Sequence, residues 1–181
     1  MTDQEIVEGC ISGKPKYQQI LYQRFAGPML NICKRYTRTQ SEAEDMLQDV
    51  FVKVFLNIHR FRFESTLGYW IKRLTVNTLI SNQRKKNVNN NLVDIEEMAQ
   101  ELPEVTVPAD ATVPMDVLLG MIRELPEGYR TIFNMREIDG YELQEIAEIV
   151  GCSNSTVRSQ LFKAKNVLKK KVEEWLKTEI K

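Results

Sequence analysis

Residues 140–171 read GYELQEIAEIVGCSNSTVRSQLFKAKNVLKKK, and their pattern decides the fold of the C-terminal part of the chain. Two short apolar series, one before and one after Gly151, recur at the three- and four-residue spacing of a helix face. Gly151 is typical of a helix C-terminus, and Ser153 is a good N-cap for a following helix. The stretch therefore predicts a helix-turn-helix. The two series are Leu143, Ile146, Ala147 and Val150, then Val157, Leu161, Ala164 and Leu168.

The outer face of the second helix suits DNA. Residues 152–171 contain six Lys or Arg and no Asp or Glu. Small polar, guanidinium and aromatic groups on such a face can contact base edges in the major groove while lysines contact phosphates. A solvated basic face on an ordinary bundle helix is the alternative that spacing leaves open. The candidate DNA contacts are Ser155, Thr156, Arg158, Ser159, Phe162 and Lys163.

Charge is distributed unevenly along the 181 residues, although 25 basic and 25 acidic residues give a formal net charge of zero. Residues 52–86 hold eight basic groups and one acidic group, whereas residues 87–116 hold seven acidic groups and no basic one. We therefore expect two small all-α domains, residues 1–86 and residues 115–181, joined by an acidic flexible linker over residues 87–114.

Apolar spacing predicts three helices in the first 60 residues. The second is expected to kink at Pro28. Ser41, with Glu44 three residues later, predicts a capping box at the start of the third helix, which should run to about His59. The core stripe expected on the first helix is Ile6, Val7, Cys10 and Ile11.

The third helix carries a second stripe that mixes carboxylates with aliphatic side chains. Such a mixture is expected where helices of another protein dock. The alternative is that Val52 and Leu56 contact a neighbouring helix of the same domain. The candidate protein-binding residues are Asp45, Gln48, Asp49, Val52 and Leu56.

A basic, aromatic loop over residues 59–66 precedes a fourth helix, expected over roughly residues 65–86. Aromatic rings and guanidinium groups can hold a base that has left the duplex, and the amide of Asn77 can pair with an unstacked base edge. The alternative is that Phe61, Phe63 or Trp70 fills the core, and burial is the better expectation for Trp70. The candidate single-strand contacts are Arg60, Phe61, Arg62, Phe63, Ser65, Lys72, Arg73 and Asn77.

Catalysis and metal binding have little support in the sequence. It has one His and none of the common nucleotide-binding, zinc-protease or hydrolase motifs, so we expect no catalytic residue, no metal and no cofactor. Cys10, Cys33 and Cys152 show no CxxC spacing and indicate free thiols in a reducing cytosol. With neither a signal peptide nor a membrane span in view, a cytoplasmic protein without direct membrane insertion is expected.

Three segments resemble, in order and spacing, the extracytoplasmic-function (ECF) class of bacterial RNA polymerase sigma factors. They are SEAEDMLQDVFVKVFLNIHRF (41–61), STLGYWIKRLTVNTLISNQRKK (65–86) and LPEGYRTIFNMREIDGYELQEIAEIVGCSNSTVRSQLFKAK (125–165). The resemblance implies that residues 1–86 form region two and residues 115–181 form region four. Gln160 and Lys163 stand where many relatives have arginine, and Ser155 replaces a common glycine.

The resemblance also implies the partners. The stripe on the third helix would bind core RNA polymerase, the loop and Asn77 would recognise the minus-ten element of promoter DNA, and the helix-turn-helix would recognise the minus-thirty-five element. The linker would follow the polymerase RNA-exit path; the alternative is a solubilising spacer, because residues 87–114 contain no specific motif. An anti-sigma factor, often membrane-anchored in the family, would hold the protein inactive.

A stand-alone helix-turn-helix repressor or activator is the competing hypothesis. Such a protein normally dimerises to match a palindromic operator, and the sequence shows no sustained heptads that would form a dimer seam.

Overall fold

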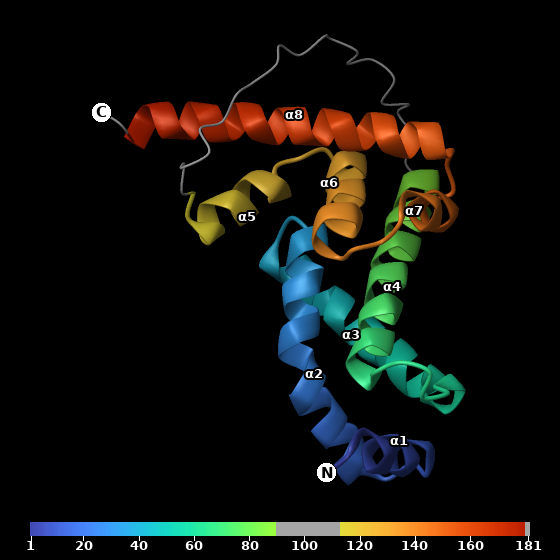
Figure 1. The fold of residues 1–181 in the computed structure, drawn as a ribbon. Helices are drawn as coiled ribbons and strands as arrows, with labels where there is room; N and C mark the ends of the chain where they lie inside the picture. The colour runs from blue at the N-terminus through green and yellow to red at the C-terminus, as the bar shows by residue number, and fades with distance from the viewer. Residues whose placement is uncertain (90–112, 180–181) are drawn as a thin grey trace. The chain divides into compact units, whose positions relative to one another are not determined.

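The computed structural model describes residues 1–89 and 113–179, and the chain divides into two compact units, Met1–Lys85 and Lys86–Lys181. All regular elements among the described residues are helical, which confirms the predicted all-α class (Figure 1). Each unit has its own set of buried apolar side chains.

The acidic linker predicted over residues 87–114 falls mostly outside the described residues. At its N-terminal end the prediction was wrong by three residues, because residues 87–89 belong to the helix that began in the first unit. Nothing in the sequence stops that helix at residue 86, since the following asparagines and valine are poor but tolerated helix residues.

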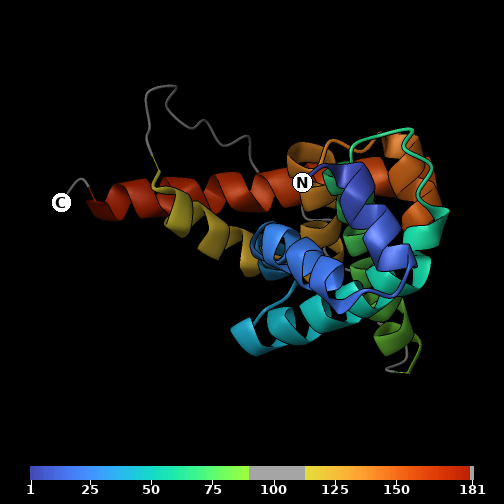
Figure 2. The same ribbon diagram turned by 90° about the horizontal axis from the view of Figure 1, so that it is seen from below.

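The first unit consists of four α-helices and a 3-10 turn. Helices α2 and α3 lie side by side, and α1 packs against α2 (Figure 2). Helix α4 is fastened to α2 because the Gln83 amide donates a hydrogen bond of 3.2 Å to the carbonyl of Tyr36, one of the last carbonyls of α2. The elements are α1 (Asp3–Ile11), α2 (Pro15–Tyr36), α3 (Gln40–Asn57), η1 (Ile58–Arg60) and α4 (Leu67–Asn89).

Two local predictions for the first unit were wrong. Helix α3 begins two residues earlier than predicted, because its N-cap is Thr39 rather than Ser41. The Thr39 side chain accepts a 3.1 Å hydrogen bond from the Glu42 amide. Ile11 is exposed rather than buried, since α1 ends there and the chain turns away. Pro28 lies within α2, which continues to Tyr36.

The described part of the second unit consists of four α-helices with a π-helical turn inserted between the second and the third. The apolar face of α5 packs on α8, where Ala164, Leu168 and Val172 are buried against Met121 and Leu125. The elements are α5 (Met115–Arg123), α6 (Glu127–Phe133), η2 (Asn134–Ile138), α7 (Leu143–Val150) and α8 (Asn154–Glu179).

A buried cation joins α5 to α6. Arg130 is almost fully buried, and its guanidinium donates hydrogen bonds to the carbonyls of Arg123 (2.7 Å) and Leu125 (3.5 Å). These carbonyls lie at the C-terminal end of α5, where no intrahelical amide is available to them and where positive charge is favourable. The contact fixes the end of α5 and so supports the platform on which α8 rests.

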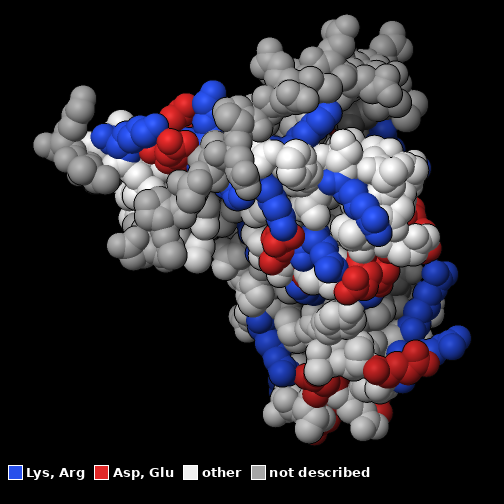
Figure 3. All heavy atoms as spheres, turned by 45° about the horizontal axis from the view of Figure 1, so that its top comes forward, with Lys and Arg blue, Asp and Glu red and all other residues white. Residues whose placement is uncertain are grey.

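Basic and acidic side chains are interspersed on the molecular face that Figure 3 shows. This mixture agrees with the zero net charge of the sequence. Any nucleic-acid surface on the drawn face must therefore be local, formed by particular cations on particular helices.

Candidate nucleic-acid and protein interfaces

The turn of the helix-turn-helix has the cap geometry that its sequence predicts. Gly151 ends α7 in the left-handed region (φ 81°, ψ 40°), which glycine adopts without steric cost, and its amide donates to the carbonyl of Ala147 at 2.8 Å. Ser153 then caps α8, because its Oγ accepts a 3.0 Å hydrogen bond from the Thr156 amide. The predicted helix-turn-helix is confirmed.

The loop before α7 is also fastened. Arg136 donates to the carbonyl of Tyr141 at 2.9 Å and forms a 3.0 Å ion pair with Glu142, the N-cap residue of α7. The orientation of α7 under α8 is therefore set from both of its ends.

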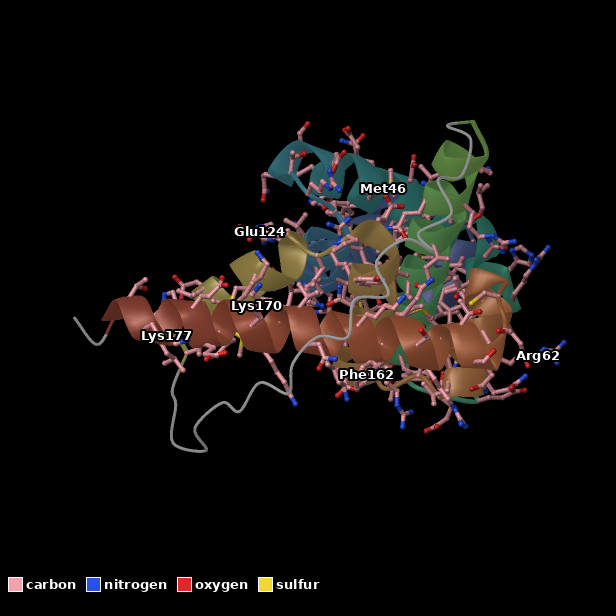
Figure 4. The ribbon with its side chains drawn as sticks, turned by 90° about the horizontal axis from the view of Figure 1, so that it is seen from above. Met46, Arg62, Glu124, Phe162, Lys170 and Lys177 are labelled. Carbon is pink, nitrogen blue, oxygen red and sulfur yellow. The ribbon has the colours of Figure 1, made fainter. Side chains whose placement is uncertain are left out.

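The predicted DNA-contacting residues of α8 lie on its outer face. Ser155, Arg158 and Ser159 are exposed, Thr156 and Lys163 are half-buried, and the ring of Phe162 is 66% exposed (Figure 4). Val157, Ala164 and Leu168 are buried on the opposite side and hold α8 against its unit. An exposed phenylalanine between polar and cationic groups suits apolar contact with a thymine methyl beside hydrogen bonds to base edges.

The loop in the first unit contains a ladder of three aromatic rings. Phe61 is 7% exposed, and its ring lies 4.7 Å from that of Phe63 and 5.6 Å from that of Trp70, measured between centroids. Phe63 is at the outer end of the ladder, 51% exposed, with a positive φ of 59°. Phe61 is therefore a buried support and is removed from the set of direct contacts, whereas Phe63 offers an open ring face. The remaining loop candidates, Arg60, Arg62 and Ser65, are exposed.

Helix α4 continues this surface through Asn77, whose side chain is exposed. Arg73, one turn before it, donates a 3.1 Å hydrogen bond to the hydroxyl of Tyr69 and lies over its ring. Lys72 is half-buried beside them. Tyr69 was missed by sequence reasoning, although its spacing of i, i+4 and i+8 with Arg73 and Asn77 could have identified it.

All five predicted protein-binding residues of α3 are exposed. Val52 is 58% and Leu56 66% exposed, so neither is covered by a helix of its own unit. Asp45 lies two turns and Gln48 one turn before Val52, and Asp49 accepts a 3.1 Å hydrogen bond from the Asn82 amide of α4. Exposed aliphatic side chains flanked by carboxylates form a surface that suits a partner protein with basic side chains.

Each of the three cysteines is a free thiol. Burial raises the pKa of Cys33 to about 12 and raises the pKa values of Cys10 and Cys152 above the ordinary range. Within the described residues, no three His, Cys, Asp or Glu side chains converge in a way that could hold a metal ion. None of the helices described combines the length and apolar content needed to span a bilayer.

Comparisons with known proteins identify both units. The family described as Sigma-70 region 2 matches residues 21–89, and the family described as Sigma-70, region 4 matches residues 115–168. The two matches occur in the family's order and together cover about two thirds of the chain. The chain belongs to the sigma-70 family of transcription initiation factors.

Within that family it is a sigma factor of the ECF class. It is 28% identical over 183 residues to the ECF RNA polymerase sigma-E factor of Haemophilus influenzae, covering 96% of both chains. It is also 28% identical to the sigma-E factor of Escherichia coli strain K12, covering 96% of this chain and 95% of that relative. The region 2 match disfavours the stand-alone repressor hypothesis, which gives that unit no role.

Two solved structures share the fold. The sigma factor RpoE from Bartonella quintana, solved in complex with the anti-sigma factor NepR, superposes with a TM-score of 0.54 at 18% identity and covers 84% of this chain and 94% of that one. CnrH in complex with the cytosolic domain of CnrY gives a TM-score of 0.51 at 15% identity, covering 95% and 97%.

Proposed function

We propose that the chain binds core RNA polymerase and divides promoter recognition between its two units. Residues 1–86 would bind polymerase and capture the minus-ten element, and residues 115–181 would read the minus-thirty-five element. The difference between the two candidate nucleic-acid surfaces chiefly supports this division. One has an exposed ring and a free amide suited to an unpaired base, and the other has a helix suited to an intact groove.

In the first unit, Phe63 is the proposed stacking platform and Asn77 the proposed reader of a base edge. Phe61 and Trp70 hold the platform from beneath, since the three rings contact one another in series. Arg60, Arg62 and Arg73 would bind the phosphates of the same strand. A surface of this kind can act only after the duplex opens, so polymerase is required for it to act.

The proposed polymerase contact is the α3 face formed by Asp45, Gln48, Asp49, Val52 and Leu56. A second proposed partner is an anti-sigma factor, because the RpoE structure that shares this fold was solved in complex with one. Work on promoter DNA would place the protein in the cytoplasm, and its contribution there is positioning rather than catalysis.

The test is transcription in vitro with reconstituted core polymerase and mapping of the start sites. The full chain should redirect polymerase to a defined set of promoters. Asp49→Arg should abolish association with polymerase, because it places a cation in an acidic face that is proposed to meet basic side chains. The variant should stay folded, since Asp49 is exposed.

Asn82→Ala is the matched control for that variant. It removes the same 3.1 Å hydrogen bond to Asp49 without changing the charge of the face. It should therefore bind polymerase normally. Equal loss of binding in both variants would show that the hydrogen bond, rather than the charge of the face, matters. Normal binding by folded Asp49→Arg would refute the assignment of α3.

A further inference from the structure

Helix α8 is longer than groove reading requires. It comprises 26 residues, which corresponds to a length of about 39 Å, whereas the proposed base contacts end at Lys163 and the region 4 match ends at residue 168. Lys169 and Lys170 follow directly and are exposed. Figure 4 shows Lys170 on α8 between Phe162 and Lys177.

The cations of α8 fall into two groups by their partners. Lys165 pairs with Glu137 at 2.9 Å, Lys171 pairs with Glu124, and Lys177 pairs with Glu173 at 2.8 Å. No carboxylate or other hydrogen-bonding partner within the described part of the chain engages the remaining four. These four are Arg158, Lys163, Lys169 and Lys170.

The four unpaired cations share one side of the helix. At 3.6 residues per turn they fall within an arc of about 140°, which also contains Ser155, Ser159 and Phe162. Lys171 lies outside this arc, on the side that faces α5. The proposed recognition surface therefore continues past residue 163 as a cationic edge as far as Lys170. The first acidic side chain on the same arc is Glu173, which pairs with Lys177.

We propose that Lys169 and Lys170 bind the phosphate backbone of duplex DNA beside the bases that α8 reads. This inference rests on the proposed function of α8 in the major groove. Lys169 is eleven residues after Arg158, about 16 Å along the axis, which exceeds the groove width of about 12 Å. When Arg158 is at base edges, Lys169 and Lys170 have therefore reached the phosphate wall of the groove. An ammonium group binds phosphate there as a point charge, independently of sequence.

The test uses the full chain and a mixed-sequence DNA duplex about two helical turns long. Binding is measured by fluorescence anisotropy between about 50 and 200 mM salt. Lys169→Gln/Lys170→Gln should reduce the magnitude of the slope of log affinity against log salt by about 1.8, because each lost phosphate contact removes about 0.9. Lys171→Gln is the control, since it removes the same charge from the adjacent position but from the side that binds Glu124.

An unchanged slope in the double variant, or an equal loss in Lys171→Gln, would overturn the proposal. So would failure of the wild-type chain to bind the duplex even at the lowest salt. An acidic protein is the alternative partner for Lys169 and Lys170. If the double variant kept its DNA slope but lost binding to polyglutamate, that partner would replace DNA.

Start-site mapping with the holoenzyme separates this inference from the proposed function. Lys169→Gln/Lys170→Gln should keep the wild-type start sites and lose transcription at lower salt than wild type. If Arg158→Ala changes promoter choice while the double variant behaves as wild type at all salt concentrations, groove reading stands and the phosphate contact fails. If Arg158→Ala has no effect on start sites, groove reading fails whatever the lysines do.

Discussion

Replacing Phe63 by glycine and by alanine should separate the stability of the loop from its function. The φ of 59° costs an L-residue roughly 1–2 kcal/mol, and glycine avoids this cost but loses about 0.5–1 kcal/mol of unfolded-state entropy. Both variants lose the ring contact with Phe61, worth about 0.5–1.5 kcal/mol. We therefore expect Phe63→Ala to destabilise the first unit by about 1 kcal/mol, and Phe63→Gly to be about as stable as wild type.

The two tryptophans allow this measurement on the full chain. Trp70 is in the first unit, 5.6 Å from the Phe61 ring, and Trp175 is in the second. In a Trp175→Phe background the fluorescence of Trp70 reports urea unfolding of the first unit alone. Phe61→Ala serves as the reference for a buried ring and should cost about 3–5 kcal/mol.

The loss of function in Phe63→Ala and Phe63→Gly should not follow their difference in stability. If Phe63 stacks on an unpaired base, both variants lose about 1–3 kcal/mol, which is a loss of about 5- to 140-fold in open-complex formation. The loss in open-complex formation is measured with the holoenzyme, by the permanganate reactivity of the melted promoter strand. Equal stability of the two variants would refute the strain argument. Wild-type melting by Phe63→Gly would refute the stacking role.

Three further outcomes test other parts of the structure. Arg158→Ala should weaken minus-thirty-five binding by about 1–3 kcal/mol if Arg158 reads a guanine, and Lys163→Ala should mainly lower the salt dependence of binding. If both variants keep wild-type promoter affinity at all salt concentrations, α8 does not read the groove. Gly9→Ala should destabilise the docking of α1 by about 1–3 kcal/mol in thermal unfolding, because the new Cβ would lie 2.1 Å from the Tyr17 ring. Cys33 should resist iodoacetamide at pH 8 in the folded chain and react after unfolding, because its pKa of about 12 leaves almost no thiolate.

The helices and the helix-turn-helix could be predicted because their signals are local. Gly151 stands at the one break in an apolar series, and the cap residues that begin with Ser153 place the start of the next helix within a few residues. The start of α3 was ambiguous because the sequence offers two cap residues close together. Thr39 and Ser41 both have a glutamate three residues later, and only the structure shows that Thr39 receives the amide hydrogen bond.

The loop residues could not be assigned from sequence. Phe61 and Phe63 are the same residue type in the same loop. No helical or strand spacing distinguishes the buried ring from the exposed one, because the backbone of the loop is irregular. The two rings differ in exposure because Phe63 has a positive φ, a conformation that bulky residues seldom adopt. Tyr69 could not be recognised from its residue type, because its place in the surface depends on the contact with Arg73.

The neutral net charge bears on when the protein binds DNA. Four unpaired cations on α8 correspond to a salt slope of only about −3.6, which is a small electrostatic contribution for a DNA-binding protein. The remaining basic residues are offset by 25 acidic ones, so the free chain gains little from non-specific DNA. Attachment to polymerase would instead supply a high effective concentration of both surfaces at one promoter. A weakly cationic recognition helix is therefore suited to a subunit that binds DNA weakly by itself and tightly only when attached to polymerase. Adding cations to α8 should increase binding by the free chain more than promoter-directed transcription.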